Sequence, residues 1–203
     1  MNEFRKPGMK LGITGGIGSG KTSVCRVFNV LGIPVFSADS EAQKIMNSDS
    51  RIKREINRIA GKNLYTKGFL DRPRLASLIF NDPEYLKKVN TLVHPVVLEL
   101  FKQWAELQNT PYVIMENAIL FESGASAFVD RVATIIAPVE ERIQRVMQSK
   151  KLTRDQVLDR IRNQMDDKTR IKMSDYVINN SENEMIIPVI LRIHEDLIDH
   201  LNT

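Results

Sequence analysis

The chain has 203 residues, of which 42% are hydrophobic and 27% are charged, as is typical of a globular protein with one substantial core and modest inserts. No apolar run approaches the roughly 20 residues that a membrane-spanning helix needs, and the first residues lack the apolar stretch of a secretion signal. The single cysteine, Cys25, excludes an internal disulfide and a cysteine-based zinc site. We therefore expect a cytoplasmic protein with no membrane partner.

Short runs of apolar and β-branched residues alternate with helical stretches along the chain. The expected strands are residues 10–14, 33–37, 112–116, 132–136 and 175–178. Each run is nearly continuous in apolar residues, as is typical of parallel strands that are buried on both faces. The alternation predicts an α/β fold with a doubly wound parallel sheet of about five strands.

The segment from about residue 40 to residue 107 does not fit this alternation and is expected to be a strand-free, helix-rich insertion. Apolar residues recur in it at helical spacing: Leu86, Val89, Val93, Val96, Val97, Leu100 and Trp104. Pro95 falls within this series. Because proline suits the first turn of a helix but breaks a helix interior, we expect a new helix to begin at Pro95.

Positive charge is concentrated between Arg142 and Lys172, where ten lysines and arginines stand against four aspartates. This concentration favours a polyanionic ligand, although a solvated helical face explains the charge alone equally well. The segment is expected to form two helices around residues 150–153. A final helix is expected to pack on the sheet through an apolar stripe: Ile186, Ile187, Ile190, Ile193, Leu197 and Leu201.

The sharpest motif is GGIGSGKT at residues 15–22, which matches the phosphate-binding pattern G-x-x-x-x-G-K-[ST] in full. It follows the expected strand KLGIT and precedes a helix with an apolar face. Glycines let backbone N–H groups converge on phosphate oxygens, and the following helix presents its positive N-terminal end to the same anion. Lys21 is expected to reach the β- and γ-phosphates of ATP, and Thr22 to bind Mg²⁺. The other expected cofactor-binding residues of the loop are Gly15, Gly16, Ile17, Gly18, Ser19 and Gly20.

A phosphate loop alone does not separate kinases from GTPases or motor ATPases. The Asn-Lys-x-Asp motif with which GTPases read guanine does not occur in the sequence. The apolar run VIME at 113–116 ends in a single glutamate, whereas motor ATPases usually have Asp-Glu there. The small size, the helical insertion and the basic segment therefore favour a nucleotide or metabolite kinase with a closing lid.

At this point the sequence resembles the dephospho-CoA kinase family. The resemblance rests on collinear blocks: LGITGGIGSGKTSV (11–24), LGIPVFSAD (31–39), GFLDRPRLASLIF (68–80), LVHP (92–95), ILFE (119–122), RVMQSKKLTRDQVLDRIRNQM (145–165) and SDYVINN (174–180). It implies a P-loop kinase that transfers a phosphoryl group from ATP, with Mg²⁺, to the ribose 3′-hydroxyl of dephospho-CoA, the last step of coenzyme A biosynthesis. It also implies three parts: a core (1–40, 108–140 and 173–203), an acceptor-binding insertion (41–107) and a lid (141–172).

The resemblance implies roles for individual residues. Asp39, after the second strand, would orient or deprotonate the 3′-hydroxyl. The alternative role of Asp39 is to be the N-cap of a helix that starts near Ser40. Glu116, at the end of the third strand, would bind Mg²⁺ through water or be an ordinary strand-end carboxylate. The residues implied to bind substrate are Asp39, Arg72, His94, Glu116, Arg160 and Arg162.

The lid is implied to bring arginines over the triphosphate, with Arg145 as a catalytic residue and Arg142 as an ATP-binding one. Gln164 matches a glutamine of the family, and Asn180 matches an asparagine near the adenine. The family commonly has glutamine where this chain has Arg142, arginine where it has Ser149, and proline where it has Ala118. These departures concern the individual lid assignments and not the family.

Two alternatives remain open from the sequence. Another small-metabolite or nucleoside kinase would share the core and the lid and differ only in its acceptor. A nucleotide-dependent nucleic-acid-binding module would use the basic segment to contact RNA or DNA. Because acids are interspersed in that segment and it holds no aromatic residue for base stacking, we expect no nucleic-acid partner. We expect a monomer or a weak homo-oligomer.

Overall fold

The computed structural model describes residues 8–150 and 152–201. The chain forms two compact units: unit 1 runs up to Ser37 and resumes at Trp104, and unit 2 is Ala38–Gln103. No helix within the described ranges is both long enough and apolar enough to cross a membrane.

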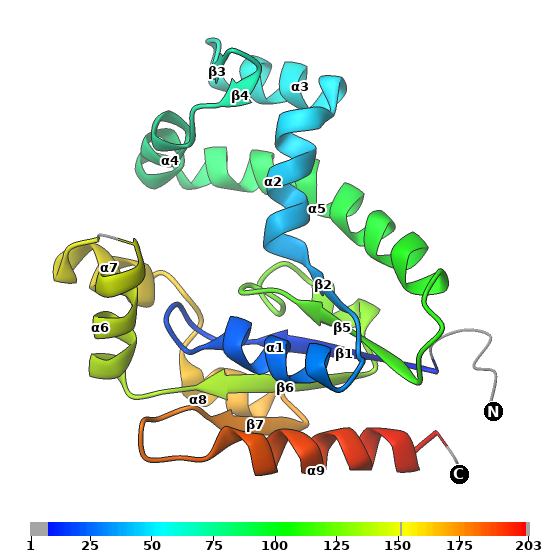
Figure 1. Ribbon diagram of the computed structural model, residues 1–203. Helices are drawn as coiled ribbons and strands as arrows, with labels where there is room; N and C mark the ends of the chain where they lie inside the picture. The colour runs from blue at the N-terminus through cyan, green and yellow to red at the C-terminus, as the bar shows by residue number, and fades with distance from the viewer. Residues whose placement is uncertain (1–7, 151, 202–203) are drawn as a thin grey trace. The chain divides into compact units, whose positions relative to one another are not determined.

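Unit 1 is built on a five-stranded sheet in which every neighbouring pair is parallel. Its strands are β1 (Met9–Thr14), β2 (Val35–Ser37), β5 (Tyr112–Glu116), β6 (Arg131–Ile136) and β7 (Tyr176–Asn179) (Figure 1). Their order, β2-β5-β1-β6-β7, confirms the predicted α/β fold class. The strand order reverses at central β1, and open α/β sheets bind ligands outside the carboxyl ends of their strands at such a point.

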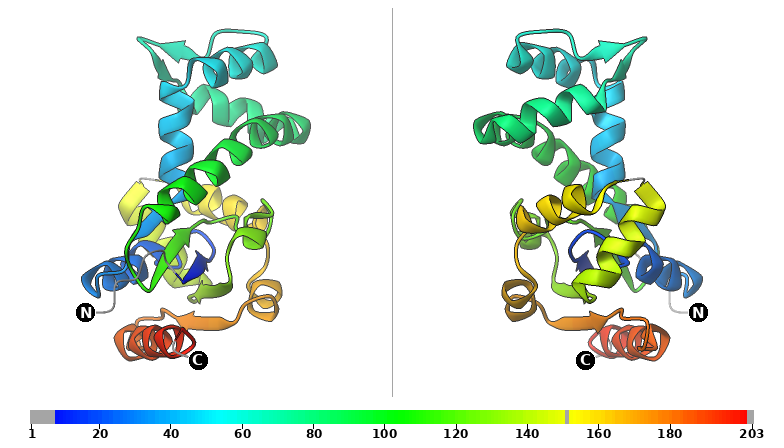
Figure 2. Two further views of the ribbon diagram at one scale, coloured as in Figure 1. Left: turned by 90° about the vertical axis from the view of Figure 1, so that its right-hand side faces the viewer. Right: turned by 90° about the vertical axis from the view of Figure 1, so that its left-hand side faces the viewer.

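Helices cover both faces of this sheet. On one face, α1 (Lys21–Val30) and α9 (Ile186–Asp199) pack side by side over the strands (Figure 2). Ile190, Ile193 and Leu197 of α9 join the main hydrophobic cluster, which confirms that the C-terminal helix packs on the sheet, whereas Ile187 is exposed. On the other face, α8 (Asp167–Lys172) contacts β6. The short helix η1 (Ala125–Phe128) belongs to the segment that links β5 to β6.

The basic segment begins with two helices, α6 (Val139–Lys150) and α7 (Arg154–Arg162), as predicted. Thr153 separates them because its side chain caps α7 while the Gln156 side chain accepts a hydrogen bond from the Thr153 N–H in return. The expectation of two helices in the whole segment is wrong, since α8 adds a third. Asp166 caps α8 by accepting from the Thr169 N–H, a local start signal that the count of charges did not use.

Unit 2 is helical except for one short hairpin. Its elements are α2 (Ala38–Ser48), α3 (Ser50–Ala60), β3 (Tyr65–Thr66), β4 (Phe69–Leu70), α4 (Arg72–Asn81) and α5 (Pro83–Glu106), the last of which continues into unit 1. The prediction of a strand-free insertion is therefore wrong. Lys67 and Gly68 both have positive φ, the conformation of a two-residue hairpin turn. Strands of two residues are too short to show an alternating pattern in the sequence.

Pro95 does not begin a helix, contrary to the prediction, but lies inside α5. Val89, Val93, Val97 and Phe101 are buried at intervals of four residues along this helix, whereas Pro95 is exposed. The burial of one continuous apolar face outweighs the hydrogen bond that proline cannot make.

The burial of His194 against the sheet should make stability depend on pH. The hydroxyl of buried Tyr112 lies 2.7 Å from Nδ1 of His194 on α9. Burial lowers the pKa of His194 from its ordinary value of 6.5, although the charge of Glu195 opposes this. The unfolded chain therefore binds more protons at this histidine. Its contribution to stability is complete above about pH 6.5 and is lost as the pH falls through the lowered pKa.

We expect the free energy of unfolding to fall less between pH 7 and pH 5 in His194→Gln than in the wild type. The difference should not exceed about 1.4 kcal/mol per pH unit, the limit for one proton. Urea unfolding at several pH values measures it, with His200→Gln, at the exposed end of the same helix, as the control. Identical pH profiles for His194→Gln and the wild type would contradict the assignment.

Candidate active site

The phosphate loop, residues 15–20, connects the carboxyl end of central β1 to the N-terminus of α1. This confirms the predicted context of strand, loop and helix. Gly20 is the N-cap residue of α1 and has no side chain with which to cap it. The first N–H groups of α1 therefore receive no hydrogen-bond acceptor from an N-cap side chain. A helix N-terminus of this kind is suited to binding an anion.

Asn180 supports the loop from the end of β7. Its Nδ2 donates to the carbonyl oxygen of Ser19 at 2.7 Å, and its own N–H donates to Ile136 at 2.8 Å. Gly20 has φ of +96°, and a Cβ there would lie 1.9 Å from Asn180 Nδ2. Only glycine is compatible with both constraints. The structure thus places Asn180 beside the loop backbone.

Lys21 and Thr22 are the first two residues of α1. Nζ of Lys21 donates to the carbonyl oxygen of Gly15 at 2.8 Å, which holds the ammonium group over the loop. The Thr22 side chain is exposed. The hydroxyl oxygens of Thr14 and Ser19 are buried and have no hydrogen-bond partner within residues 8–150 and 152–201.

The middle of the loop is held by side chains from the basic segment. Nε of Arg142 donates to the carbonyl oxygen of Ile17 at 2.9 Å, and the N–H of Ile17 donates to Oε1 of Gln164 at 2.8 Å. Arg142 is only 3% exposed. Its guanidinium lies so close to the loop that a Cβ on Gly16 would be 2.1 Å from Nη2. Gly16 is therefore required by Arg142 and not by a special backbone conformation.

The Arg142 guanidinium belongs to a partly buried ionic network. Its Nη1 contacts Asp167 Oδ2 at 3.0 Å, and Arg170 Nη1 contacts the other oxygen of Asp167 at 3.0 Å. Arg170 Nη2 also reaches Glu122 at 3.4 Å. Burial lowers the pKa of Arg142, and the charge of Asp167 opposes that shift. Each of the two buried guanidinium groups thus has a part-exposed carboxylate partner, as buried charges require.

The sequence did not single out Asp167, Arg170 or Glu122 as site residues. Glu122 was visible only as the last residue of the ILFE block, and Asp167 and Arg170 only as charges in the basic segment. These residues come from the segment after β5 and from α8, and no sequence spacing relates them to Arg142 on α6.

The other arginines of the predicted lid lie on α6 and α7. Arg145 contacts Glu141 one turn earlier on α6 at 2.8 Å, and its Nη1 is buried with no partner in the described part of the chain. Arg160 and Arg162 are exposed on α7, where Arg162 contacts Asp159 at 3.3 Å. The exposed pair between Arg154 and Glu140 ties α7 to α6 at 2.7 Å.

Glu116 ends β5 at the carboxyl edge of the sheet, the edge from which the phosphate loop also leaves. It is paired in register with Ser37, the last residue of β2. The Ser37 hydroxyl donates to Glu116 Oε2 at 2.8 Å.

Three of the predicted acceptor-binding residues belong to unit 2. Asp39 is exposed in the first turn of α2, and because this helix begins at Ala38, the interpretation of Asp39 as an N-cap is wrong. Arg72 begins α4, where its Nη2 donates to Gln43 at 2.7 Å. His94 is half-buried on α5, and burial lowers its pKa, so its imidazole is neutral at pH 7.

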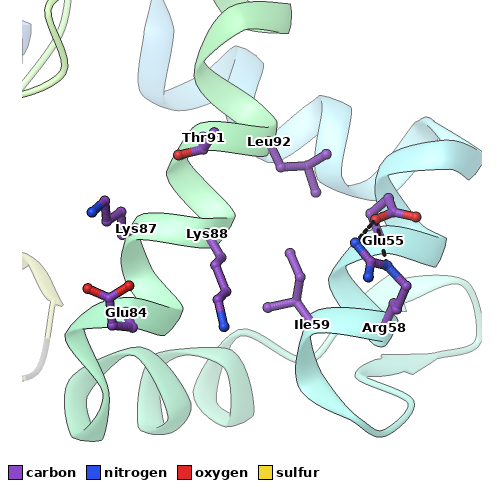
Figure 3. A pocket seen from close by; sticks show the side chains of 8 residues that line it. All are labelled: Glu55, Arg58, Ile59, Glu84, Lys87, Lys88, Thr91 and Leu92. Carbon is purple, nitrogen blue, oxygen red and sulfur yellow. Dashed lines mark hydrogen bonds and ion pairs between the residues drawn. The ribbon is translucent and has the colours of Figure 1, made fainter.

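Unit 2 also holds a cavity of about 640 Å³ between α3 and α5 (Figure 3). Its lining residues are Glu55, Arg58, Ile59, Glu84, Lys87, Lys88, Thr91 and Leu92. Arg58 is paired with Glu55 at 2.7 Å, and Ile59 and Leu92 give the cavity an apolar wall. None of the lining residues was predicted as a site residue, and neither Arg72 nor His94 lines the cavity.

Known proteins resemble this chain over almost all of its length. A dephospho-CoA kinase from Bacteroides fragilis is 36% identical over 91% of each chain, and one from Porphyromonas gingivalis is 34% identical over 91% of this chain and 92% of its own. A Thermus thermophilus protein of known crystal structure is 33% identical, covers 97% of this chain and 98% of its own, and superposes with a TM-score of 0.82.

More distant structures share the fold. Dephospho-CoA kinase from Campylobacter jejuni has a TM-score of 0.68 and 26% identity over 94% of this chain and 98% of its own. A shikimate kinase from Acinetobacter baumannii, at 16% identity over 97% of this chain and 96% of its own, has a TM-score of 0.53 and shows the fold alone. The sequence model of the dephospho-CoA kinase family matches residues 9–185. The chain therefore belongs to the dephospho-CoA kinase family.

Proposed function

We propose that this protein transfers the γ-phosphoryl group of ATP to the ribose 3′-hydroxyl of dephospho-CoA and releases ADP and CoA, the last step of coenzyme A biosynthesis. The observation that carries the proposal is the phosphate loop at the end of the central strand, in a chain that matches the family over residues 9–185. The loop accounts for the donor, and family membership accounts for the acceptor.

ATP would bind with its phosphates on the loop N–H groups and the N-terminus of α1. Lys21, whose Nζ donates to Gly15, would bring its ammonium group to the β- and γ-phosphates and offset the charge that develops during transfer. The exposed Thr22 hydroxyl suits Mg²⁺, which binds proteins through few side chains and keeps substrate phosphates and water as its other ligands. When bound, Mg²⁺ would neutralise phosphate charge.

The acceptor would be served by residues of unit 2, with Asp39 as the catalytic one. Its exposed carboxylate can accept a hydrogen bond from a hydroxyl, orient that oxygen for attack on the γ-phosphorus and take its proton as the bond to phosphorus forms. Arg72 and neutral His94 would bind the rest of the acceptor, as cation and as hydrogen-bonding group respectively. Glu116 would assist at the sheet edge through water bound to Mg²⁺.

The arginines of the lid, residues 141–172, would complete the site. Arg145, Arg160 and Arg162 would approach the triphosphate, where guanidinium groups match phosphate geometry better than ammonium groups do. Closure of the lid would keep out water that would otherwise hydrolyse ATP. We further propose that the protein acts in the cytoplasm as a monomer or weak homo-oligomer and without a nucleic-acid partner.

The purified protein should release ADP from ATP and Mg²⁺ only when dephospho-CoA is present, with CoA as the second product. A coupled ADP-release assay measures this, with adenosine and common nucleosides as competing acceptors. Release that is equal without an acceptor, or that occurs only with another nucleoside, would overturn the acceptor while leaving the phosphate loop in place. Strongly salt-dependent binding to RNA or DNA would instead indicate that the protein has a nucleic-acid partner.

Lys21→Ala should lower kcat at least about 100-fold, comparable to the loss of one major electrostatic contribution to phosphoryl transfer. Steady-state kinetics with dephospho-CoA test it. Lys44→Ala, which removes an exposed lysine paired with Glu41 at 2.6 Å, should leave kcat unchanged. Near-normal turnover in Lys21→Ala would remove this lysine from the mechanism.

Asp39→Asn should also lower kcat at least about 100-fold, because an amide cannot accept the proton of the hydroxyl. ATP affinity should change little. Glu41→Gln, a substitution of the same kind in the same helical turn, is the matched control. If both variants turned over at the wild-type rate, Asp39 would have no role in activating the acceptor.

A further inference from the structure

We propose that Arg142 and Gln164 are positioning residues that hold the Ile17 peptide of the phosphate loop, so that nucleotide affinity depends on side chains outside the motif. The inference rests on the proposed binding of ATP at this loop. It assigns Arg142 a role different from direct contact with ATP.

Ile17 is held at three points. Gln164 accepts a hydrogen bond from its N–H, Arg142 donates one to its carbonyl oxygen, and its side chain packs against a buried cluster of Ile143, Val146 and Val157. All of these partners lie on α6 or α7 or directly after α7. The middle residue of the loop is therefore fixed by the basic segment on its N–H, its carbonyl and its side chain.

The direction of the Arg142 guanidinium is fixed as well. Nη1 of Arg142 contacts one carboxylate oxygen of Asp167, while Nε of Arg142 donates to the loop carbonyl of Ile17. Arg170 contacts the other carboxylate oxygen of Asp167. Arg170 is 0% exposed and is itself paired with Glu122. If Arg142 turned away from the loop, its buried guanidinium would lose the Asp167 carboxylate that pairs with it, which is costly. The network therefore supports one orientation of Arg142.

Fixing Ile17 prepares the loop for phosphate. The N–H of Ile17 is bound to Gln164, and the N–H of Ser19 donates to the carbonyl of Gly16 at 3.1 Å. These bonds set the curl of the loop with partners from the chain itself. A nucleotide then meets an ordered set of donors and does not have to order the loop itself, which favours tight binding.

The test is the affinity of the full-length protein for ADP with Mg²⁺, measured by isothermal titration calorimetry. Arg142→Gln and Gln164→Ala should each raise the Kd for ADP about 10-fold, as expected for the loss of a charge-assisted or buried hydrogen bond. The double variant should raise it by much less than the product of the two effects, because both side chains hold the same peptide. Arg142→Lys should restore affinity in part, since an ammonium can reach the carbonyl but cannot also reproduce the planar contact with Asp167.

The matched control is Arg154→Ala, which removes an exposed pair on the same helices and should leave the Kd within about twofold of the wild type. Gln164 takes no part in the ionic network, so Gln164→Ala tests the proposal even if Arg142→Gln unfolds. At saturating substrates kcat should fall less than about threefold in Gln164→Ala, because the residue contacts no reacting group.

Three results would overturn the inference: wild-type ADP affinity in folded Gln164→Ala, multiplicative effects in the double variant, or a fall in kcat at unchanged Kd. A protein that binds ADP as described but does not phosphorylate dephospho-CoA would instead refute the proposed function and support the role of Arg142 and Gln164. Failure of the wild type to bind ADP would overturn both.

Discussion

A phosphate loop must keep its backbone curled so that several N–H groups converge on one point, and a chain in water pays conformational entropy to do so. In this protein Gly20 takes a left-handed conformation, and the N–H groups of Ile17 and Ser19 are bound to Gln164 and Gly16. The curl is thus held by hydrogen bonds within the chain. Other parts of unit 1 anchor the ends of this loop and support its middle.

Both ends of the loop are anchored in the same hydrophobic cluster of unit 1. Leu11 and Ile13 of β1 are fully buried at one end, and Val24 and Phe28 of α1 are fully buried at the other. A short helix owes most of its stability to such packing, so the burial of α1 also fixes the direction of its N-terminus. Because β1 is the central strand, the positive end of that helix lies where the sheet order reverses, and it is available to an anion there.

Features that occupy contiguous residues could be predicted from the sequence, whereas those assembled from distant segments could not. Residues 15–22 contain the glycines, Lys21 and Thr22 in one run, and the buried strands are continuous apolar runs. The prediction that a helix begins at Pro95 was wrong because a local rule about proline takes no account of the buried helix face that continues past this residue. The contacts of Arg142 with Ile17 and Asp167 join residues 125 and 25 positions apart, so no local pattern indicates them.

Charge alone does not distinguish an arginine that binds a ligand from one that supports the fold. Arg142 and Arg170 are buried and share Asp167, whereas Arg160 and Arg162 are exposed. A buried guanidinium that leaves its carboxylate loses the anion that offsets the cost of its own burial, whereas an exposed guanidinium changes partner at little cost. The charge of a transferring phosphoryl group shifts among its oxygens during the reaction, and exposed arginines can follow that shift more easily than buried ones. The net charge of the basic segment thus combines two populations, buried arginines that contact the loop or its supporting carboxylate and exposed arginines for which we propose a role toward phosphate.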